Sequence, residues 1–307
     1  MAFIHAVVLG IIQGVAELFP ISSAAHTLLL SYLFGWQLPS LPFVVMLHLG
    51  TFLAVLVYFA RDYGRLIAGF FSGFGDAFRQ PFERLALLVI AGTIPLAIVG
   101  KAFEKFFDKL FAMPAFAAAF LLVTGLVLFA AERIRQGDAK AEQLSFGKAV
   151  LVGLSQVGGL VPGGSRSGFS IAGGMLAGMS REESARFSFL LAGPAIVGAS
   201  AFEIRRIVHP HANAVGQHNI ALLGVAPEPL AVIATGFVVA FICGLFAMLF
   251  YALCRQAPVD AVRGVLLDLR RRMSRHHRPA RARDNAVSMP RRVSSKTVTL
   301  LRSSRPR

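Results

Sequence analysis

Five side chains able to do chemistry fall within fourteen residues of an apolar stretch near the N-terminus. The stretch runs from Phe3 to Phe34, and residues 13–26 of it carry an amide, a carboxylate, two hydroxyls and an imidazole. Ionisable groups at membrane depth cost free energy, so they usually face a cavity and serve a function. The sequence therefore predicts a polar pocket within a membrane segment, formed by Gln13, Glu17, Ser22, Ser23 and His26.

A proline divides this stretch and creates a new helix start. Pro20 breaks the helix, and a broken helix in lipid is tolerated only where protein or a water-filled cavity surrounds it. Ser22 or Ser23 can then cap the restarting helix, whose free N–H groups favour an anion. Ser23 and His26 are three residues apart, so on a helix they share a face.

A second broken stretch, residues 158–170, is rich in glycine and serine around Pro162. Glycine lets a backbone turn tightly and approach a ligand closely. A helix restarting at Ser165 would direct N–H groups at an anion. The planar guanidinium of Arg166 can donate two hydrogen bonds to phosphate or carboxylate oxygens. An arginine at this depth needs a partner, for which Glu17 and a ligand phosphate are the candidates. The alternative is that a Glu17–Arg166 ion pair has only a structural task.

The remaining apolar runs are long enough to cross a membrane as helices. They cover residues 41–60, 85–100, 113–131, 187–204 and 230–254, with charged connectors between them. The chain is 55% hydrophobic and 15% charged, which is unlike an ordinary soluble domain. We therefore expect an all-α polytopic membrane protein.

A constant offset of 143 residues relates the two broken stretches. It pairs Gly10 with Gly153, Gln13 with Gln156 and Ser22 with Ser165. Interrupted segments at matching positions of two repeats indicate a binding site at the repeat interface. We expect an inverted repeat with two re-entrant broken-helix segments, within a membrane-embedded domain of residues 1–254 whose halves are about 1–132 and 144–254.

The basic character of the chain belongs to its end. Of the formal net charge of +15, +12 falls in residues 255–307, which hold 15 Lys/Arg and 3 Asp/Glu. The high isoelectric point is therefore no sign of a nucleic-acid-binding core, and we expect no nucleic-acid partner. The tail itself is expected to be disordered.

These motifs resemble those of the undecaprenyl-diphosphate phosphatases, the bacitracin-resistance proteins. The resemblance covers about residues 3–255 and is carried by Gln13-x-x-x-Glu17, Pro20-Ile-Ser22-Ser23-x-x-His26 and Pro162-Gly-x-Ser165-Arg166-Ser167. It implies hydrolysis of undecaprenyl diphosphate to undecaprenyl phosphate and inorganic phosphate, which recycles the lipid carrier of peptidoglycan synthesis in the bacterial cytoplasmic (inner) membrane. The chain departs from the family in having Ser170 where threonine is common, and an Arg-rich tail in place of a final span.

Phosphoryl transfer needs positive charge and aimed donors around the phosphate oxygens, together with an in-line nucleophile. Ser23 is our choice of nucleophile, with His26 or Glu17 as base; attack by His26 itself or by an activated water are the alternatives. A divalent cation, Mg²⁺ or Ca²⁺, is a further candidate, with Glu17 as its ligand. We expect catalytic roles for Ser23, His26, Glu17 and Arg166, and substrate contacts from Gln13, Ser22, Gly163, Gly164, Ser165, Ser167 and Ser170.

Two other interpretations accompany these expectations. His48, in the apolar run 41–60, is interpreted as a packed, hydrogen-bonded histidine rather than a catalyst. The main functional rival is a lipid-phosphate transporter or flippase, because inverted repeats with broken helices are transporter architecture. A transporter does not require a nucleophile, so the set of Ser23, His26 and Arg166 favours an enzyme. The sequence leaves the oligomeric state open, and membrane lipids are the only other partners expected.

Overall fold

The protein is built from helices, which we describe from a computed structural model of the chain. The structure describes residues 1–76, 78–133, 137–208 and 228–256, and no strand forms among them. This confirms the all-α fold class, while residues 257–307 of the predicted tail lie outside the described residues. In chain order the helices are α1 (Phe3–Ala16), α2 (Ser23–Leu33), α3 (Leu41–Tyr58), α4 (Ala60–Asp76), α5 (Pro81–Ala102), α6 (Glu104–Phe111), α7 (Pro114–Arg133), the 3₁₀ turn η1 (Ala141–Gln143), α8 (Phe146–Ser155), the 3₁₀ turn η2 (Gln156–Leu160), α9 (Arg166–Leu176), α10 (Arg181–Val208) and α11 (Leu230–Gln256).

Within the described residues, five helices are long and apolar enough to cross a membrane. They are α3, α5, α7, α10 and α11, and each coincides with one of the apolar runs predicted from the sequence. The chain is therefore a multi-pass membrane protein. The re-entrant path of the two broken segments stays a prediction.

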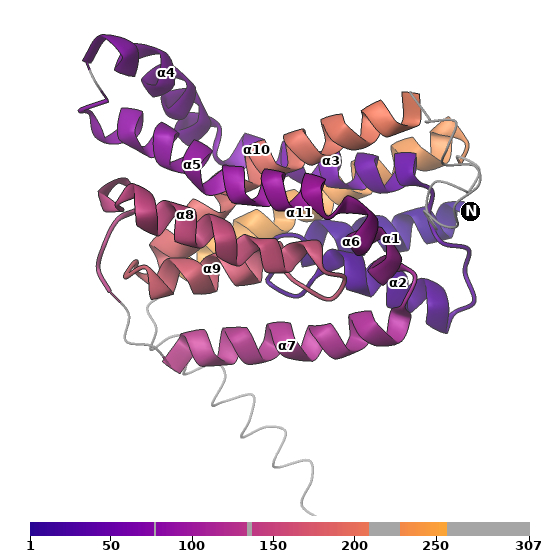
Figure 1. The fold of residues 1–307 in the computed structure, drawn as a ribbon. Helices are drawn as coiled ribbons and strands as arrows, with labels where there is room; N and C mark the ends of the chain where they lie inside the picture. Colours follow the sequence, from indigo (N-terminus) through magenta and orange to yellow (C-terminus); the bar gives the residue numbers. More distant parts are fainter. Residues whose placement is uncertain (77, 134–136, 209–227, 257–307) are drawn as a thin grey trace, which may run out of the picture. The chain divides into compact units, whose positions relative to one another are not determined.

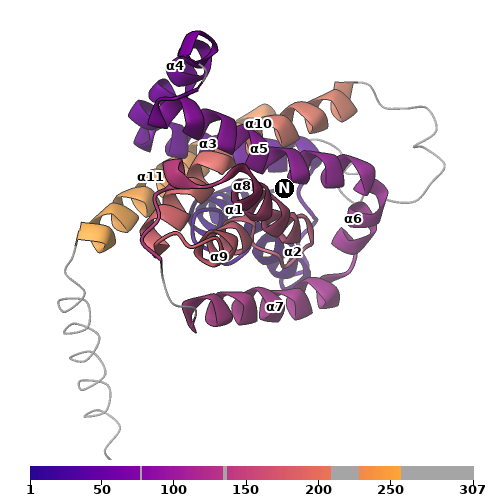
Figure 2. The same cartoon turned by 60° about the vertical axis from the view of Figure 1, so that its left-hand side comes forward.

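The two broken segments form helical hairpins at the centre of this part of the chain. Figure 1 shows the pair α1–α2 entering from the right and the pair α8–α9 from the left. In Figure 2 the same four helices are surrounded by longer ones. Their starts recur at the predicted offset, because α1 and α8 begin at Phe3 and Phe146, and α2 and α9 begin at Ser23 and Arg166.

Glycines let each broken segment pack closely on a span from the other half. A Cβ on Gly14 of α1 would stand 2.7 Å from the carbonyl oxygen of Ala240 on α11. A Cβ on Gly153 of α8 would stand 2.3 Å from the carbonyl oxygen of Gly92 on α5. Small residues of this kind allow helix backbones to approach in a membrane. The α1–α11 and α8–α5 contacts thus interlock the two halves.

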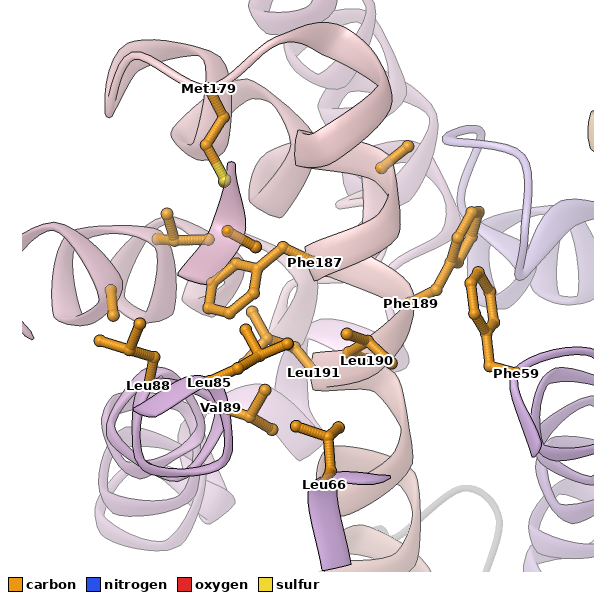
Figure 3. Close-up of a cluster of buried hydrophobic side chains, with 14 of the residues drawn as sticks. Phe59, Leu66, Leu85, Leu88, Val89, Met179, Phe187, Phe189, Leu190 and Leu191 are labelled. Atoms are coloured by element: carbon orange, nitrogen blue, oxygen red, sulfur yellow. The ribbon is translucent and has the colours of Figure 1, made fainter. Parts of the chain in front are cut away.

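The largest buried cluster of apolar side chains supports one side of the hairpins. Phe187, Leu190 and Leu191 of α10 are buried against Leu85 and Leu88 of α5 (Figure 3). Helices at this depth gain little from the hydrophobic effect, so close side-chain packing provides much of their attraction. The cluster fixes α10 relative to α5.

A proline interrupts α10, and a tyrosine from α4 repairs the break. Pro194 has no N–H, so the carbonyl of Leu190 loses its partner within the helix. The Tyr63 hydroxyl lies 3.0 Å from the carbonyl oxygen of Phe189 and 3.3 Å from that of Leu190. The same hydroxyl accepts the backbone N–H of Gly193 at 3.1 Å. This bridge stabilises α10 beside Pro194, and Pro194 lines the cavity that is described below.

We predict that Tyr63→Phe lowers the stability of the folded protein. The substitution keeps the ring but removes the buried hydroxyl that bonds α10 where Pro194 provides no N–H, which costs about 1–3 kcal/mol. Thermal unfolding in detergent micelles measures the effect. Tyr32→Phe is the matched control, because Tyr32 is 69% exposed. Equal melting temperatures for the two variants would show that the bridge is unimportant.

Candidate active site

A carboxylate from one broken segment meets a guanidinium from the other. Arg166 Nη2 donates to Glu17 Oε1 at 3.0 Å, and the two side chains are only 13% and 11% exposed. The Arg166 Nη1 group is buried and has no hydrogen-bond partner among the residues that the structure describes. A buried donor of this kind is costly unless something else accepts from it. The guanidinium therefore has one edge committed to Glu17 and one edge available to a ligand.

Three further groups converge on Glu17. The Ser23 hydroxyl donates to Oε2 at 2.9 Å, and the Gln13 amide nitrogen lies 3.4 Å from the same oxygen. The Ser167 hydroxyl donates to the backbone carbonyl of Glu17 at 3.3 Å. One oxygen of the carboxylate thus accepts from Ser23, the candidate nucleophile, and the other accepts from Arg166, the candidate phosphate-binding residue. We call Gln13, Glu17, Ser23, Arg166 and Ser167 the polar centre.

Two capped helix starts flank the polar centre. Ser22 is the N-cap of α2 and accepts the Ala25 N–H at 3.4 Å; Ser165 is the N-cap of α9 and accepts the Gly168 N–H at 3.1 Å. The sequence predicts Ser22 or Ser23 as the first cap, and of these the structure has Ser22; it also predicts a helix restarting at Ser165, which caps α9. The first turn of a helix carries free N–H groups and the positive end of its dipole. Two such starts at one place favour a ligand with more than one negative charge.

The loop before α9 depends on a glycine. Gly163 has a φ of +97°, and a Cβ there would stand 2.4 Å from the carbonyl oxygen of Ala117 on α7. Its own carbonyl accepts the Thr124 hydroxyl at 2.7 Å. Gly163 therefore shapes the loop and docks it on α7, and it does not line the cavity described next.

The polar centre opens into a cavity of about 610 Å³. This volume lies within the range of about 300–1,000 Å³ that is usual for ligand sites. Beyond the polar centre the wall is mostly apolar, with α5, α6 and α10 contributing side chains that include Leu96, Phe107, Phe111, Ile196 and Phe202. A polar end joined to an apolar channel suits an amphiphilic ligand with an anionic head.

The structure brings most of the predicted site residues together in this cavity, and leaves three outside its lining. Ser170 donates to the carbonyl of Arg166 at 2.7 Å and also lies within hydrogen-bond distance of the Ser188 hydroxyl. It therefore links α9 to α10. His26 and Gly163 are the other two predicted site residues that do not line the cavity. The predicted residues that line the cavity are Gln13, Glu17, Ser22, Ser23, Gly164, Ser165, Arg166 and Ser167.

Of the two bases predicted for Ser23, it is Glu17 and not His26 that accepts its hydroxyl in the structure. His26 Nδ1 lies 2.8 Å from the Ser22 carbonyl, and the Ser23 hydroxyl is bonded to Glu17 instead. Ser22 has a φ of +64°, which is a strained backbone conformation for a residue other than glycine. The contact from His26 therefore holds the turn that carries Ser23.

A histidine that we interpreted as packed lies in the cavity instead. His48 is hydrogen-bonded as expected, with Nδ1 2.9 Å from the Val44 carbonyl. Its side chain is nevertheless 30% exposed and lines the cavity, with Nε2 3.8 Å from Glu17 Oε2. The rule that singled out Glu17, an ionisable group in an apolar membrane run, applies equally to His48 and would have found it.

The side chains do not fit a resident metal ion. Within the described ranges, no group of three His, Cys, Asp or Glu residues could hold one. Glu17 is the carboxylate of the polar centre, and Arg166 and Ser23 already donate to its oxygens. The divalent cation expected from the sequence stays a prediction.

Comparison with known proteins identifies relatives over most of the chain. Residues 6–257 match the model of the family described as bacitracin resistance protein BacA. The undecaprenyl-diphosphatase of Geobacter metallireducens is 41% identical over 223 residues, which cover 72% of this chain and 82% of the relative.

Two further relatives carry the same name. The undecaprenyl-diphosphatase of Geotalea daltonii is 38% identical over 252 residues, covering 81% of this chain and 88% of the relative. That of Mycolicibacterium paratuberculosis is 36% identical over 282 residues, with the same coverage of 81% and 88%.

We predict that a glycine at position 22 restores part of the activity that His26→Ala removes. If His26 acts by holding the strained turn, Ser22→Gly relieves the strain directly, and glycine replaces a serine cap at a cost of only a few tenths of a kcal/mol. The measurement is the phosphate-release rate of the single variants and of the double variant. A double variant no faster than His26→Ala would favour His26 as a base.

Proposed function

The chain belongs to the bacitracin resistance protein BacA family, and from this membership we propose that it is a membrane phosphatase that converts undecaprenyl diphosphate to undecaprenyl phosphate and inorganic phosphate. The proposal includes the cellular role that follows from this reaction. Returning the lipid carrier to the monophosphate form serves peptidoglycan synthesis and confers resistance to bacitracin. We place the enzyme in the bacterial cytoplasmic (inner) membrane.

The free Nη1 edge of Arg166 is the observation that carries the proposal. A structural ion pair with Glu17 would need only the edge that is already bonded, whereas the second edge is buried and finds no acceptor in the described part of the chain. A phosphate oxygen can accept from it, and guanidinium–phosphate hydrogen bonds are strong because both groups are charged. The apolar channel beside it suits the prenyl chain of the substrate.

Ser23 is the nucleophile in this proposal. Its hydroxyl already donates to Glu17 Oε2 at 2.9 Å, so the carboxylate can take the proton as the oxygen attacks phosphorus. Arg166 and the N–H groups at the start of α9 stabilise the charge on the transferred phosphoryl group. The bond from the terminal phosphorus to the bridging oxygen breaks, and undecaprenyl phosphate leaves. Water then hydrolyses the phosphoserine.

A divalent cation enters this proposal as part of the substrate. Glu17 and Arg166 cancel each other in charge, while a diphosphate carries more than one negative charge. Mg²⁺ is commonly bound through substrate phosphates and keeps several of its waters. We therefore propose that undecaprenyl diphosphate arrives with Mg²⁺ or Ca²⁺ as its counter-ion.

We expect Arg166→Lys to lose most of the hydrolytic activity while the protein still folds. Lysine keeps the charge that neutralises Glu17 but cannot bond the carboxylate and a phosphate through two edges of one plane. Phosphate release from undecaprenyl diphosphate in detergent measures the loss, which should exceed about tenfold. Size-exclusion chromatography of the variant checks folding. If Arg166→Lys keeps activity within about threefold of the unmodified protein, Arg166 does not bind the phosphate as proposed. If the unmodified protein itself releases no phosphate, the result favours a transporter.

We expect a chelator to stop hydrolysis and added Mg²⁺ or Ca²⁺ to restore it. Because no set of side chains in the described ranges holds a metal, the substrate-free protein should bind neither ion tightly at the polar centre. Equilibrium dialysis of the protein with the metal alone tests this, and phosphate release tests the dependence. Full activity in the presence of chelator would remove the cation from the proposal.

A further inference from the structure

His48 approaches the polar centre from a helix that no predicted site residue occupies. It stands on α3, and its Nε2 lies 3.8 Å from Glu17 Oε2, the oxygen that also accepts the Ser23 hydroxyl at 2.9 Å. Arg166 is bonded to the other oxygen of the same carboxylate. The imidazole therefore lies on the same side of Glu17 as the nucleophile.

The hydrogen bond at the other ring nitrogen fixes which atom faces the cavity. His48 Nδ1 is 2.9 Å from the Val44 carbonyl, and a carbonyl oxygen can only accept. Nδ1 therefore keeps its hydrogen, and Nε2 is the atom presented to Glu17. A histidine that carries hydrogen on both ring nitrogens donates from each, so Nε2 can then donate to a phosphate oxygen while Nδ1 stays bonded to Val44.

The charge at the polar centre calls for another donor. Glu17 and Arg166 together are neutral, and Ser23 directs its hydroxyl hydrogen, and Gln13 one of its amide hydrogens, at Glu17. A diphosphate that accepts from the Arg166 Nη1 edge and presents its terminal phosphorus to Ser23 must lie next to Glu17 Oε2. It then lies next to His48 Nε2.

We infer that His48 is a substrate-binding residue of this site, donating a hydrogen bond from Nε2 to the terminal phosphate of the diphosphate. Arg166 and His48 then hold the phosphates from two different helices, with Arg166 at one oxygen of Glu17 and both Ser23 and His48 at the other. The inference rests on the proposed function, since it concerns the same substrate. It assigns His48 the task of donating a hydrogen bond, which another side chain of similar reach can also do.

The test compares two substitutions at position 48. His48→Gln keeps a donor of similar reach, whereas His48→Leu keeps the volume and removes the donor. We expect His48→Gln to retain kcat/KM within about threefold of the unmodified enzyme, and His48→Leu to lose at least about tenfold, mainly through a higher KM, as for a lost hydrogen bond to a charged group. Phosphate release over a range of undecaprenyl diphosphate concentrations gives both constants.

A matched control removes a histidine outside the cavity. His5 stacks on Trp36 and does not line the cavity, so His5→Leu should leave kcat/KM unchanged. Thermal unfolding of each variant in detergent shows whether it is folded. A folded His48→Leu with kcat/KM within threefold overturns the inference, and so does a His48→Gln as impaired as the leucine variant. If the unmodified protein releases no phosphate, the proposed function itself fails; if it does and only these results disagree, the inference about His48 alone fails.

Discussion

A carboxylate and a guanidinium inside a membrane protein are each costly alone, and here each one is the other's partner. Glu17 belongs to the first broken segment and Arg166 to the second, and a hydrogen bond of 3.0 Å joins them. Removing either partner would leave a buried, uncompensated charge, which is strongly destabilising. The pair therefore requires the two interruptions to meet, and the close glycine contacts of α1 with α11 and of α8 with α5 allow the hairpins to reach that position.

The same pair explains why the site can be stable when empty and still bind an anion. Glu17 neutralises Arg166 through one edge of the guanidinium, so the other edge remains a donor without carrying an unbalanced charge. Two helix starts and the hydroxyl of Ser23 complete a set of groups that are already oriented before a ligand arrives. Oriented groups of this kind stabilise a transition state without paying for reorganisation during the reaction.

Much of this arrangement follows from the sequence, because the signals are local or are charges in an apolar run. The spans, the breaks near Pro20 and Pro162, and both serine caps depend on neighbouring residues, and the depth of Arg166 called for a partner such as Glu17. The roles of the two histidines do not follow in this way. The spacing of Ser23 and His26 suggested a shared face, yet the backbone turn at Ser22 directs the His26 ring to a carbonyl. His48 carries the same signal as Glu17, an ionisable group in an apolar run, but its contact with Glu17 depends on how α3 packs, which that signal does not specify.

The offset of 143 residues places two different side chains at matching helix starts. The first helical residue of α2 is Ser23 and that of α9, 143 positions later, is Arg166; each follows a serine cap. A helix start places its first side chain next to free N–H groups, which suits both a nucleophile that attacks phosphorus and a cation that holds phosphate. These two equivalent positions meet at Glu17, where Ser23 and Arg166 donate to different oxygens of the carboxylate. A substitution at one of them can then change the chemistry without changing the backbone that both halves share.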